Sequence, residues 1–161
     1  MSHDEQRPAR FYLPASVHLF LLRAGPRGQQ VLLLRRANTG YQDGNYSVIA
    51  GHLDGGETLI AAIAREAHEE AGIAAAPADL AVVGVMHCWE GDEYIHFFLA
   101  ASRWSGTIVN AEPEKCDDLS WHDLDNLPAN VIPYVRQALA NYRRGVWFDS
   151  FGWPDTHAPD Q

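Results

Sequence analysis

Short apolar runs recur along the chain and are separated by turn-forming residues, a pattern that predicts β-strands. The first two runs flank a Gly-Pro-Arg-Gly segment, which is typical of a hairpin. A segment rich in Gly, Asn and Asp over residues 38–45 predicts a loop. The runs cover residues 17–22, 31–34, 46–50, 80–87 and 94–101, with a further short strand expected around Trp121.

Two longer segments have the period of an α-helix instead. Over residues 58–71 apolar side chains recur every three or four positions, and Gly72 follows as a stop signal. Residues 132–144 show the same spacing and end before Gly145. Strands therefore come before, between and after two helices. This order predicts an α/β (α+β) fold in which helices pack on a mixed β-sheet.

Length and composition favour one folded unit over residues 1–161. With 161 residues, 47% hydrophobic and 20% charged, the chain resembles an ordinary globular domain, and no Gly/Ser or long polar tract suggests a linker. We expect an irregular arm over residues 1–15 and an aromatic tail over residues 146–161. The tail has three open placements: against the domain, over a cleft, or in a dimer contact.

The protein is expected to be cytoplasmic and to have no membrane span. Residues 1–10 lack the apolar segment of a signal peptide, and no apolar stretch approaches the ~20 residues of a transmembrane helix. In that compartment Cys88 and Cys116 are expected to be reduced thiols. A net charge of −9 disfavours a protein that grips nucleic-acid backbone. It does not disfavour a phosphate substrate that is carried by metal ions.

The first helix carries a cluster of carboxylates that points to such ions. Glu66, Glu69 and Glu70 are related as i, i+3 and i+4 and so share one helix face, apart from the apolar one. Like charges at this spacing are mutually unfavourable, whereas carboxylate oxygens are the ligands that Mg²⁺ prefers. A solvated helix face, partly neutralised by Arg65, is the alternative interpretation. The glycines before the helix favour a ligand site, and Glu57 can pair with Arg65.

The segment from Gly51 to Ile73 resembles the signature of the Nudix hydrolases in full. Its fixed positions are Gly51, Glu57, Arg65-Glu66, Glu69-Glu70 and Gly72, with apolar residues after Glu66 and Gly72. Seven fixed residues match by chance about once in 10⁸ starting positions. Ala67 stands where a larger aliphatic residue is common, which we interpret as a packing variation.

The resemblance implies a Nudix-type α/β/α sandwich whose box, residues 51–73, is a loop-helix-loop that binds Mg²⁺ or Mn²⁺. It implies Glu66, Glu69 and Glu70 as metal ligands, together with the backbone carbonyl of Ala50. Glu57 and Arg65 would hold the loop in shape. The residue that takes the proton of the attacking water is expected to be Glu66 or Glu69, with a later glutamate as a third option.

That later glutamate lies in the loop before the Trp121 strand, which carries Glu112 and Glu114. Many family members place an assisting carboxylate there, and we favour Glu114 over Glu112 as a further metal ligand. A solvated loop charge is the alternative for either residue.

The expected substrate contacts are His52, inside the box loop, and the aromatic residues Tyr46, Trp89 and Tyr94. A base stacked on one of these rings gains ~1 to 3 kcal/mol. Core or rim packing is the alternative interpretation for each aromatic residue, and the more common one. The histidines that fall in predicted strands, namely His18, His87 and His96, are interpreted as supporting groups.

The size of the chain resembles the small single-domain members of the family that act on nucleotides. We expect hydrolysis of a nucleoside triphosphate, normal or oxidised, to a nucleoside monophosphate and pyrophosphate. Alternatives are an NDP-sugar, a dinucleoside polyphosphate, capped RNA or NADH as substrate. A non-catalytic nucleotide sensor, and an isoprenoid diphosphate isomerase that uses Cys88 or Cys116, are alternatives of other classes. The sequence leaves the oligomeric state open, and a homodimer is one of the alternatives.

Overall fold

The computed structural model describes residues 10–154, in which eight strands and two α-helices follow one another along the chain. The strands are β1 (Ala15–Gly25), β2 (Gly28–Arg36), β3 (Tyr46–Ser47), β4 (Ile49–His52), β5 (Ala81–Trp89), β6 (Glu93–Ala101), β7 (Cys116–Asp123) and β8 (Phe148–Phe151). The helices are α1 (Leu59–Ala71) and α2 (Pro133–Arg144), with a short 3₁₀ helix at Pro77–Asp79.

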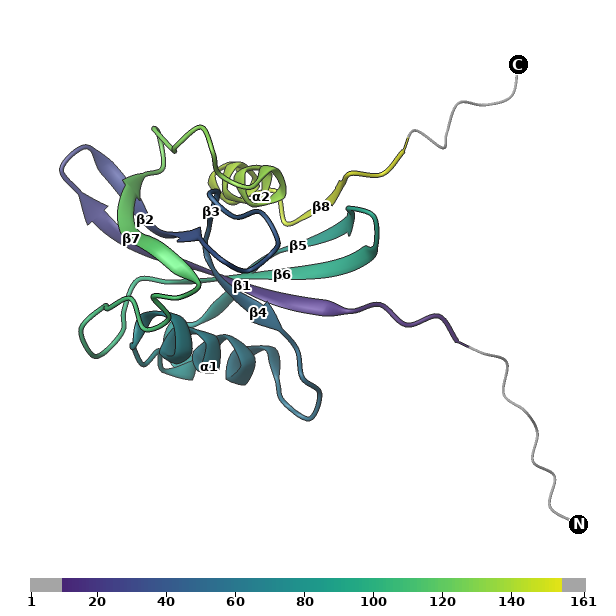
Figure 1. Ribbon diagram of the computed structural model, residues 1–161, viewed down its shortest axis with the longest axis horizontal. Helices are drawn as coiled ribbons and strands as arrows, with labels where there is room; N and C mark the ends of the chain where they lie inside the picture. Colours follow the sequence, from purple (N-terminus) through teal and green to yellow (C-terminus); the bar gives the residue numbers. More distant parts are fainter. Residues whose placement is uncertain (1–9, 155–161) are drawn as a thin grey trace, which may run out of the picture.

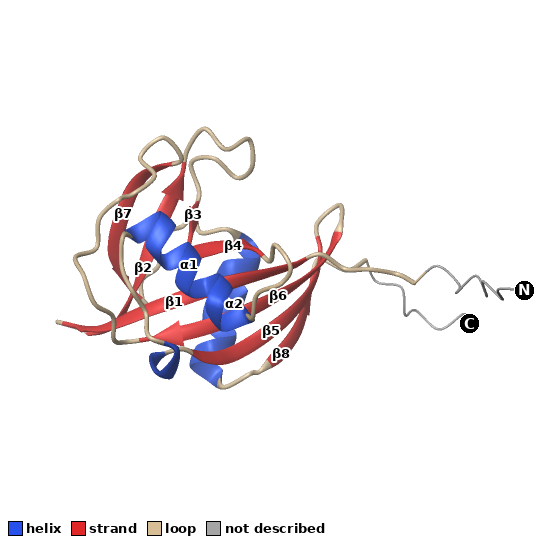
Figure 2. Cartoon of the chain, turned by 90° about the horizontal axis from the view of Figure 1, so that it is seen from below, coloured by secondary structure: helices blue, strands red, loops and turns tan. Residues whose placement is uncertain are grey.

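Strand β1 is the centre of the sheet. Its residues 16–19 pair antiparallel with β4, residues 22–25 pair antiparallel with β2, and residues 15–21 pair parallel with β6. Strand β2 also pairs with β3 and β7, and β5 lies between β6 and β8 (Figure 2). The sheet is therefore mixed, and the box strand β4 and strand β6 flank the same half of β1.

The side chains of β1 alternate between two apolar layers. Val17, Leu19 and Leu21 pack with α1, whereas Phe20 and Leu22 pack with α2 on the other face of the sheet. Figure 1 shows the two helices on opposite sides of the sheet. A strand that is buried on both faces reads as a continuous apolar run, which explains the sequence pattern at this point. The predicted mixed sheet flanked by helices is confirmed.

Both helices have clear end signals. The Thr58 hydroxyl accepts a hydrogen bond from the Ala61 N–H at 3.1 Å and so caps the start of α1. Gly72 and Gly145 end the two helices at φ of 67° and 69°, a left-handed conformation that glycine adopts without strain. The helices begin one residue later than the sequence pattern predicts.

Three expectations about strands and chain ends change in detail. The run 46–50 is two short strands, because β3 pairs with β2 while β4 pairs with β1. Strand β1 begins at Ala15, within the segment assigned to the N-terminal arm, of which residues 1–9 lie outside the described part. The aromatic tail docks on the domain as β8, and its residues 155–161 are likewise outside the description.

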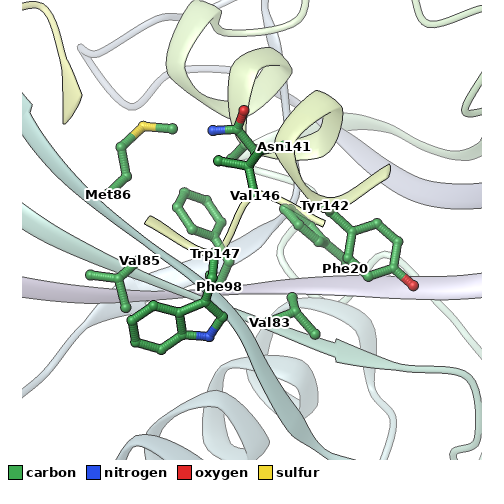
Figure 3. A pocket seen from close by; sticks show the side chains of 11 residues that line it. Phe20, Val83, Val85, Met86, Phe98, Asn141, Tyr142, Val146 and Trp147 are labelled. Carbon is green, nitrogen blue, oxygen red and sulfur yellow. The ribbon is translucent and has the colours of Figure 1, made fainter. Parts of the chain in front are cut away.

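A narrow cleft lies beside the tail, where α2 covers the sheet. Met86 and Phe98 of the sheet line it together with Asn141 and Tyr142 of α2 (Figure 3). Its volume of about 10 Å³ is too small for a nucleotide. Among residues 10–154 no helix is long and apolar enough to cross a membrane, and Cys88 and Cys116 are buried free thiols.

Candidate active site

A large cavity opens where the box meets the central strands. Its volume is about 860 Å³. Residues of the box, of β1 and β6, of the β2–β3 and β5–β6 loops, of the loop before β7 and of α2 line it. The size lies within the range of pockets that hold small molecules and cofactors.

Arg65 on α1 organises the box loop. Its guanidinium donates to both carboxylate oxygens of Glu57, at 2.8 and 3.3 Å, and to the His52 carbonyl at 3.3 Å. The same group donates to Glu66 at 2.7 Å. Hydrogen bonding to Arg65 lowers the pKa of Glu57, so this carboxylate is ionised and ties the loop to the helix. The expected pairing of Glu57 with Arg65 is present.

Gly51 leaves the space that the Glu66 carboxylate fills. A Cβ atom at position 51 would lie 1.9 Å from Glu66 Oε1 and 2.1 Å from Glu66 Cδ. Glu66 is 9% exposed, and burial raises its pKa, a shift that Arg65 opposes and the nearby Glu69 and Glu112 reinforce. The first glycine of the box is therefore required by a side chain of the helix.

Glu70 lies one helical turn further along α1. Its Oε2 accepts a hydrogen bond from the Ala50 N–H at 3.0 Å. Burial raises the pKa of Glu70 to about 8, and the carboxylates of Glu66 and Glu112 add to the shift, although the Ala50 N–H opposes it. Glu69 is more exposed, at 48% of its side chain, and lies at the cavity edge. All three box glutamates on the helix thus line the cavity.

Glu112, rather than Glu114, comes next to these carboxylates. The Ala111 N–H donates to the Glu70 carbonyl at 3.2 Å, which ties the loop before β7 to the end of α1. The neighbouring Glu112 then lines the cavity, whereas Glu114 is exposed and outside the lining. Glu112 is therefore a candidate ligand beside Glu114, which stays a prediction from the sequence.

Of the four residues expected to contact the substrate, two line the cavity and two do not. His52 and Tyr94 line the cavity, with ring centres 6.3 Å apart. Tyr46 and Trp89 do not line it. The Tyr46 hydroxyl donates to Asp118 at 2.6 Å, and the Trp89 ring lies 5.5 Å from Trp153 of the tail. In this structure Tyr46 and Trp89 therefore make packing contacts outside the cavity lining.

The cavity also contains a group of polar residues on the other face of β1, of which the sequence analysis singled out only His18 and His96, as supporting groups. Ser16, His18, His96 and Tyr134 all line the cavity, and each is buried. Arg36, at the end of β2, lines it as well. The pattern of β1 contains a signal for this group, because Ser16 and His18 interrupt one face of an otherwise apolar strand.

The donors around Glu66 and Glu70 fit a divalent cation. Seven acidic side chains line the cavity against two basic ones, Arg36 and Lys115. Hard oxygen donors of this kind, left partly buried and mutually repelling, are what Mg²⁺ or Mn²⁺ stabilises. Within residues 10–154 they have not converged into a compact cluster, since Glu66 is turned to Arg65 and Glu70 to the Ala50 N–H.

Comparison with known proteins places this fold and box in one family. The model of the NUDIX domain matches residues 13–142. The crystal structure of a MutT NUDIX hydrolase from Burkholderia pseudomallei superposes with a TM-score of 0.72 at 25% identity, covering 81% of this chain and 98% of the other. The chain belongs to the Nudix hydrolases.

Curated relatives share part of their length with this chain. An NAD-capped RNA hydrolase NudC from Stutzerimonas stutzeri is 30% identical over 118 residues, which are 72% of this chain and 39% of the relative. The NudC of Pseudomonas aeruginosa is 34% identical over 102 residues, or 63% of this chain and 34% of the relative. This chain therefore spans between a third and two fifths of the length of these two relatives.

The raised pKa of Glu70 predicts a pH-dependent effect of Glu70→Gln on the metal-free protein. Below about pH 4.5 the carboxyl is protonated whether folded or unfolded, but between 4.5 and about 8 only the unfolded chain releases the proton. Folding therefore becomes less favourable as the pH rises through this window. The variant keeps an acceptor for Ala50 and removes that cost.

We expect Glu70→Gln to raise the free energy of unfolding by a few kcal/mol at about pH 8.5 and by clearly less at about pH 5.5. Urea unfolding in EDTA at both pH values measures this difference. Glu69→Gln, at a more exposed position of the same helix, is the control and should show little change between the two. An equal gain for Glu70→Gln at both pH values contradicts the assignment.

The fit of Gly51 against Glu66 predicts opposite effects for two Gly→Ala changes. Gly51→Ala displaces the Glu66 carboxylate and should lower the free energy of unfolding by about 1–3 kcal/mol. At Gly84, a new Cβ would meet its nearest atoms at 3.5 and 4.0 Å, an ordinary contact. Gly84→Ala should therefore be neutral or stabilising by up to about 1 kcal/mol. Denaturant unfolding compares the two, and equal effects would refute the steric argument.

Proposed function

We propose that this protein is a Mg²⁺- or Mn²⁺-dependent hydrolase of a nucleoside diphosphate linked to a further group. The foremost substrate class is a nucleoside triphosphate, normal or oxidised, which is split into a nucleoside monophosphate and pyrophosphate. The observation that carries the proposal is the division of one cavity into two ends. Box carboxylates occupy one end, and uncharged aromatic and polar side chains occupy the other.

The carboxylate end suits the diphosphate only in the presence of cations. With seven acidic side chains against two basic ones, the cavity alone repels a polyphosphate. A divalent cation held there would offset the charge of the phosphate groups and would lower the pKa of an attacking water. Glu66, Glu69, Glu70 and Glu112 are the side chains proposed to hold it, with the Ala50 carbonyl as a backbone donor.

The protein residues would supply orientation and proton transfer. Arg65 and Glu57 fix the loop that carries Gly51, so that Glu66 keeps its place. Arg36 is proposed to anchor a phosphate oxygen, because its guanidinium is held by the Tyr41 carbonyl at 2.7 Å and the Thr39 hydroxyl at 3.0 Å. Glu66 or Glu69 is proposed as the group that accepts the proton of the water.

A dinucleotide of the NAD type is the second candidate substrate. The names of the relatives favour it, since both are NAD-capped RNA hydrolases of at least 30% identity. An RNA-linked substrate is less favoured by the net charge of −9. Isomerase chemistry on a cysteine is disfavoured, because burial raises the pKa of Cys88 to about 12 and also raises that of Cys116. The same two free thiols support a cytoplasmic location.

The proposal is tested by measuring phosphate and pyrophosphate release with Mg²⁺ and then Mn²⁺. The substrates are nucleoside triphosphates, their oxidised forms, NDP-sugars, dinucleoside polyphosphates, NADH and NAD-capped RNA. Turnover of one class is expected, with complete loss in EDTA. Glu66→Gln should lower kcat by about 10²–10⁴-fold with an unchanged circular dichroism spectrum. If no substrate is hydrolysed and a nucleotide only raises Tm, the protein is a sensor instead.

The placement of the loop before β7 predicts different effects for its two glutamates. Glu112→Gln removes a carboxylate next to Glu66 and Glu70, so kcat/KM should fall at least about tenfold and more Mg²⁺ should be needed for half-maximal rate. Glu114→Gln changes a solvated charge and should alter kcat/KM by less than about twofold. Steady-state kinetics over a Mg²⁺ series distinguishes them. A larger loss for the Glu114 variant would restore the assignment expected from the sequence.

A further inference from the structure

The uncharged end of the cavity is built by residues of β1, β6 and α2. Strand β1 pairs with β4 and with β6, so that Ser16 lies opposite both His52 of the box and His96. Two strand spacings, about 10 Å, thus separate the box strand from the strand of His96. A ligand whose phosphates lie at the box has room for a sugar before it reaches this end.

His96 is fixed in a stack of rings. Its ring lies between Tyr94, at 5.7 Å and 13°, and Tyr134, at 4.6 Å and 18° between planes. Its Nδ1 is hydrogen-bonded to the Ser16 hydroxyl at 2.5 Å. Among the described residues Nε2 has no hydrogen-bond partner, and His96 lines the cavity. The orientation of the ring is therefore set by protein contacts, while one polar edge stays available to a ligand.

The neighbouring His18 indicates that the polar side chains at this end of the cavity are not required for packing. Its Nε2 is hydrogen-bonded to the Tyr134 hydroxyl at 2.8 Å, but its buried Nδ1 has no partner in the described chain. A buried polar atom without a partner costs free energy that an apolar side chain would avoid. The other buried positions of β1 are all Val, Leu or Phe. Polar residues kept here at that cost point to a ligand.

The two histidines at this end are poorly suited to bind a phosphate group. Burial lowers the pKa of His96 to about 4 and lowers that of His18 as well, so both rings are neutral at physiological pH. Binding a phosphate group takes a cation or a row of N–H donors. A neutral imidazole flanked by aromatic rings instead matches a planar, uncharged heterocycle with donors and acceptors on its edge.

We propose that Ser16, His18, His96 and Tyr134 form the base-binding subsite, and that His96 Nε2 determines specificity through a hydrogen bond to the edge of the heterocyclic base. Tyr94 extends the wall toward His52 and the box. The inference rests on the proposed function in so far as the ligand is a nucleotide. Ser16 is a positioning residue, because it acts through the His96 ring.

The test compares ligands with and without a base. Calorimetric titration with Mg²⁺ gives Kd values for AMP, GMP, CMP, UMP and nicotinamide mononucleotide, and for ribose 5-phosphate as the ligand without a base. At least one nucleotide should bind about tenfold or more tightly than ribose 5-phosphate. His96→Phe keeps a ring in the stack and removes the hydrogen bond. It should lose that preference and leave the Kd of ribose 5-phosphate unchanged.

His122→Phe is the matched control, since His122 is a partly buried strand histidine that is hydrogen-bonded to Ser120 at 2.8 Å and lies outside the cavity lining. Its base preference should equal that of the unchanged protein. If His96→Phe does not fold, nitrogen NMR of histidine-labelled unchanged protein decides. The His96 Nε2 resonance should shift on titration with the preferred nucleotide and stay in place with ribose 5-phosphate.

The outcomes separate this subsite from the proposed reaction. Equal Kd values for all ligands, a preference that persists in His96→Phe, or an unmoved Nε2 resonance overturns the subsite, even if the protein hydrolyses nucleotides. A base preference that depends on His96 in a protein without turnover supports the subsite and overturns the reaction.

Discussion

Two carboxylates are buried side by side in the second half of α1, and the arrangement of the box depends on this constraint. Glu66 and Glu70 repel each other in a place where water is largely excluded, and burial raises the pKa of both. Such a pair is unfavourable unless each member has a partner. Arg65 serves Glu66, and the Ala50 N–H serves Glu70. The box loop must therefore run where it does, with glycine at position 51 because a Cβ atom would collide with Glu66.

Nudix hydrolases generally use divalent cations, and buried carboxylates that repel each other suit such ions. The partners of the two carboxylates hold them near one another without gathering them into a compact cluster. Arg65 has a second, bidentate partner in Glu57, so the loop stays anchored whichever partner Glu66 takes. The box thus separates two tasks, since Glu57 and Arg65 maintain the shape while the remaining carboxylates are free to change partners.

The sequence predicts the elements and the box well because their signals are local. Helical spacing, a Thr58 cap and a left-handed Gly72 define α1 within about 15 residues of chain. The choice between Glu112 and Glu114 depends instead on the Ala111 hydrogen bond to Glu70, which joins segments about 40 residues apart. The bond between Ser16 and His96 spans 80 residues and arises from the parallel pairing of β1 with β6. A pairing between distant strands leaves no local pattern in the sequence. The only sequence signal for the uncharged end of the cavity is therefore the presence of two polar residues in an apolar strand.

The central strand β1 fixes the position of one end of the cavity relative to the other. Its odd-numbered residues from Val17 to Leu21 support α1 and hence the carboxylates, while Ser16 and His18 on the other face approach His96 and Tyr134. A slip of the register of β1 by one residue would exchange these faces, burying the polar side chains beneath α1. Pairing with β4 and β6 at once makes such a slip costly. The rigid sheet therefore sets the distance between the charged and the uncharged end, and with it the length of ligand that can contact both.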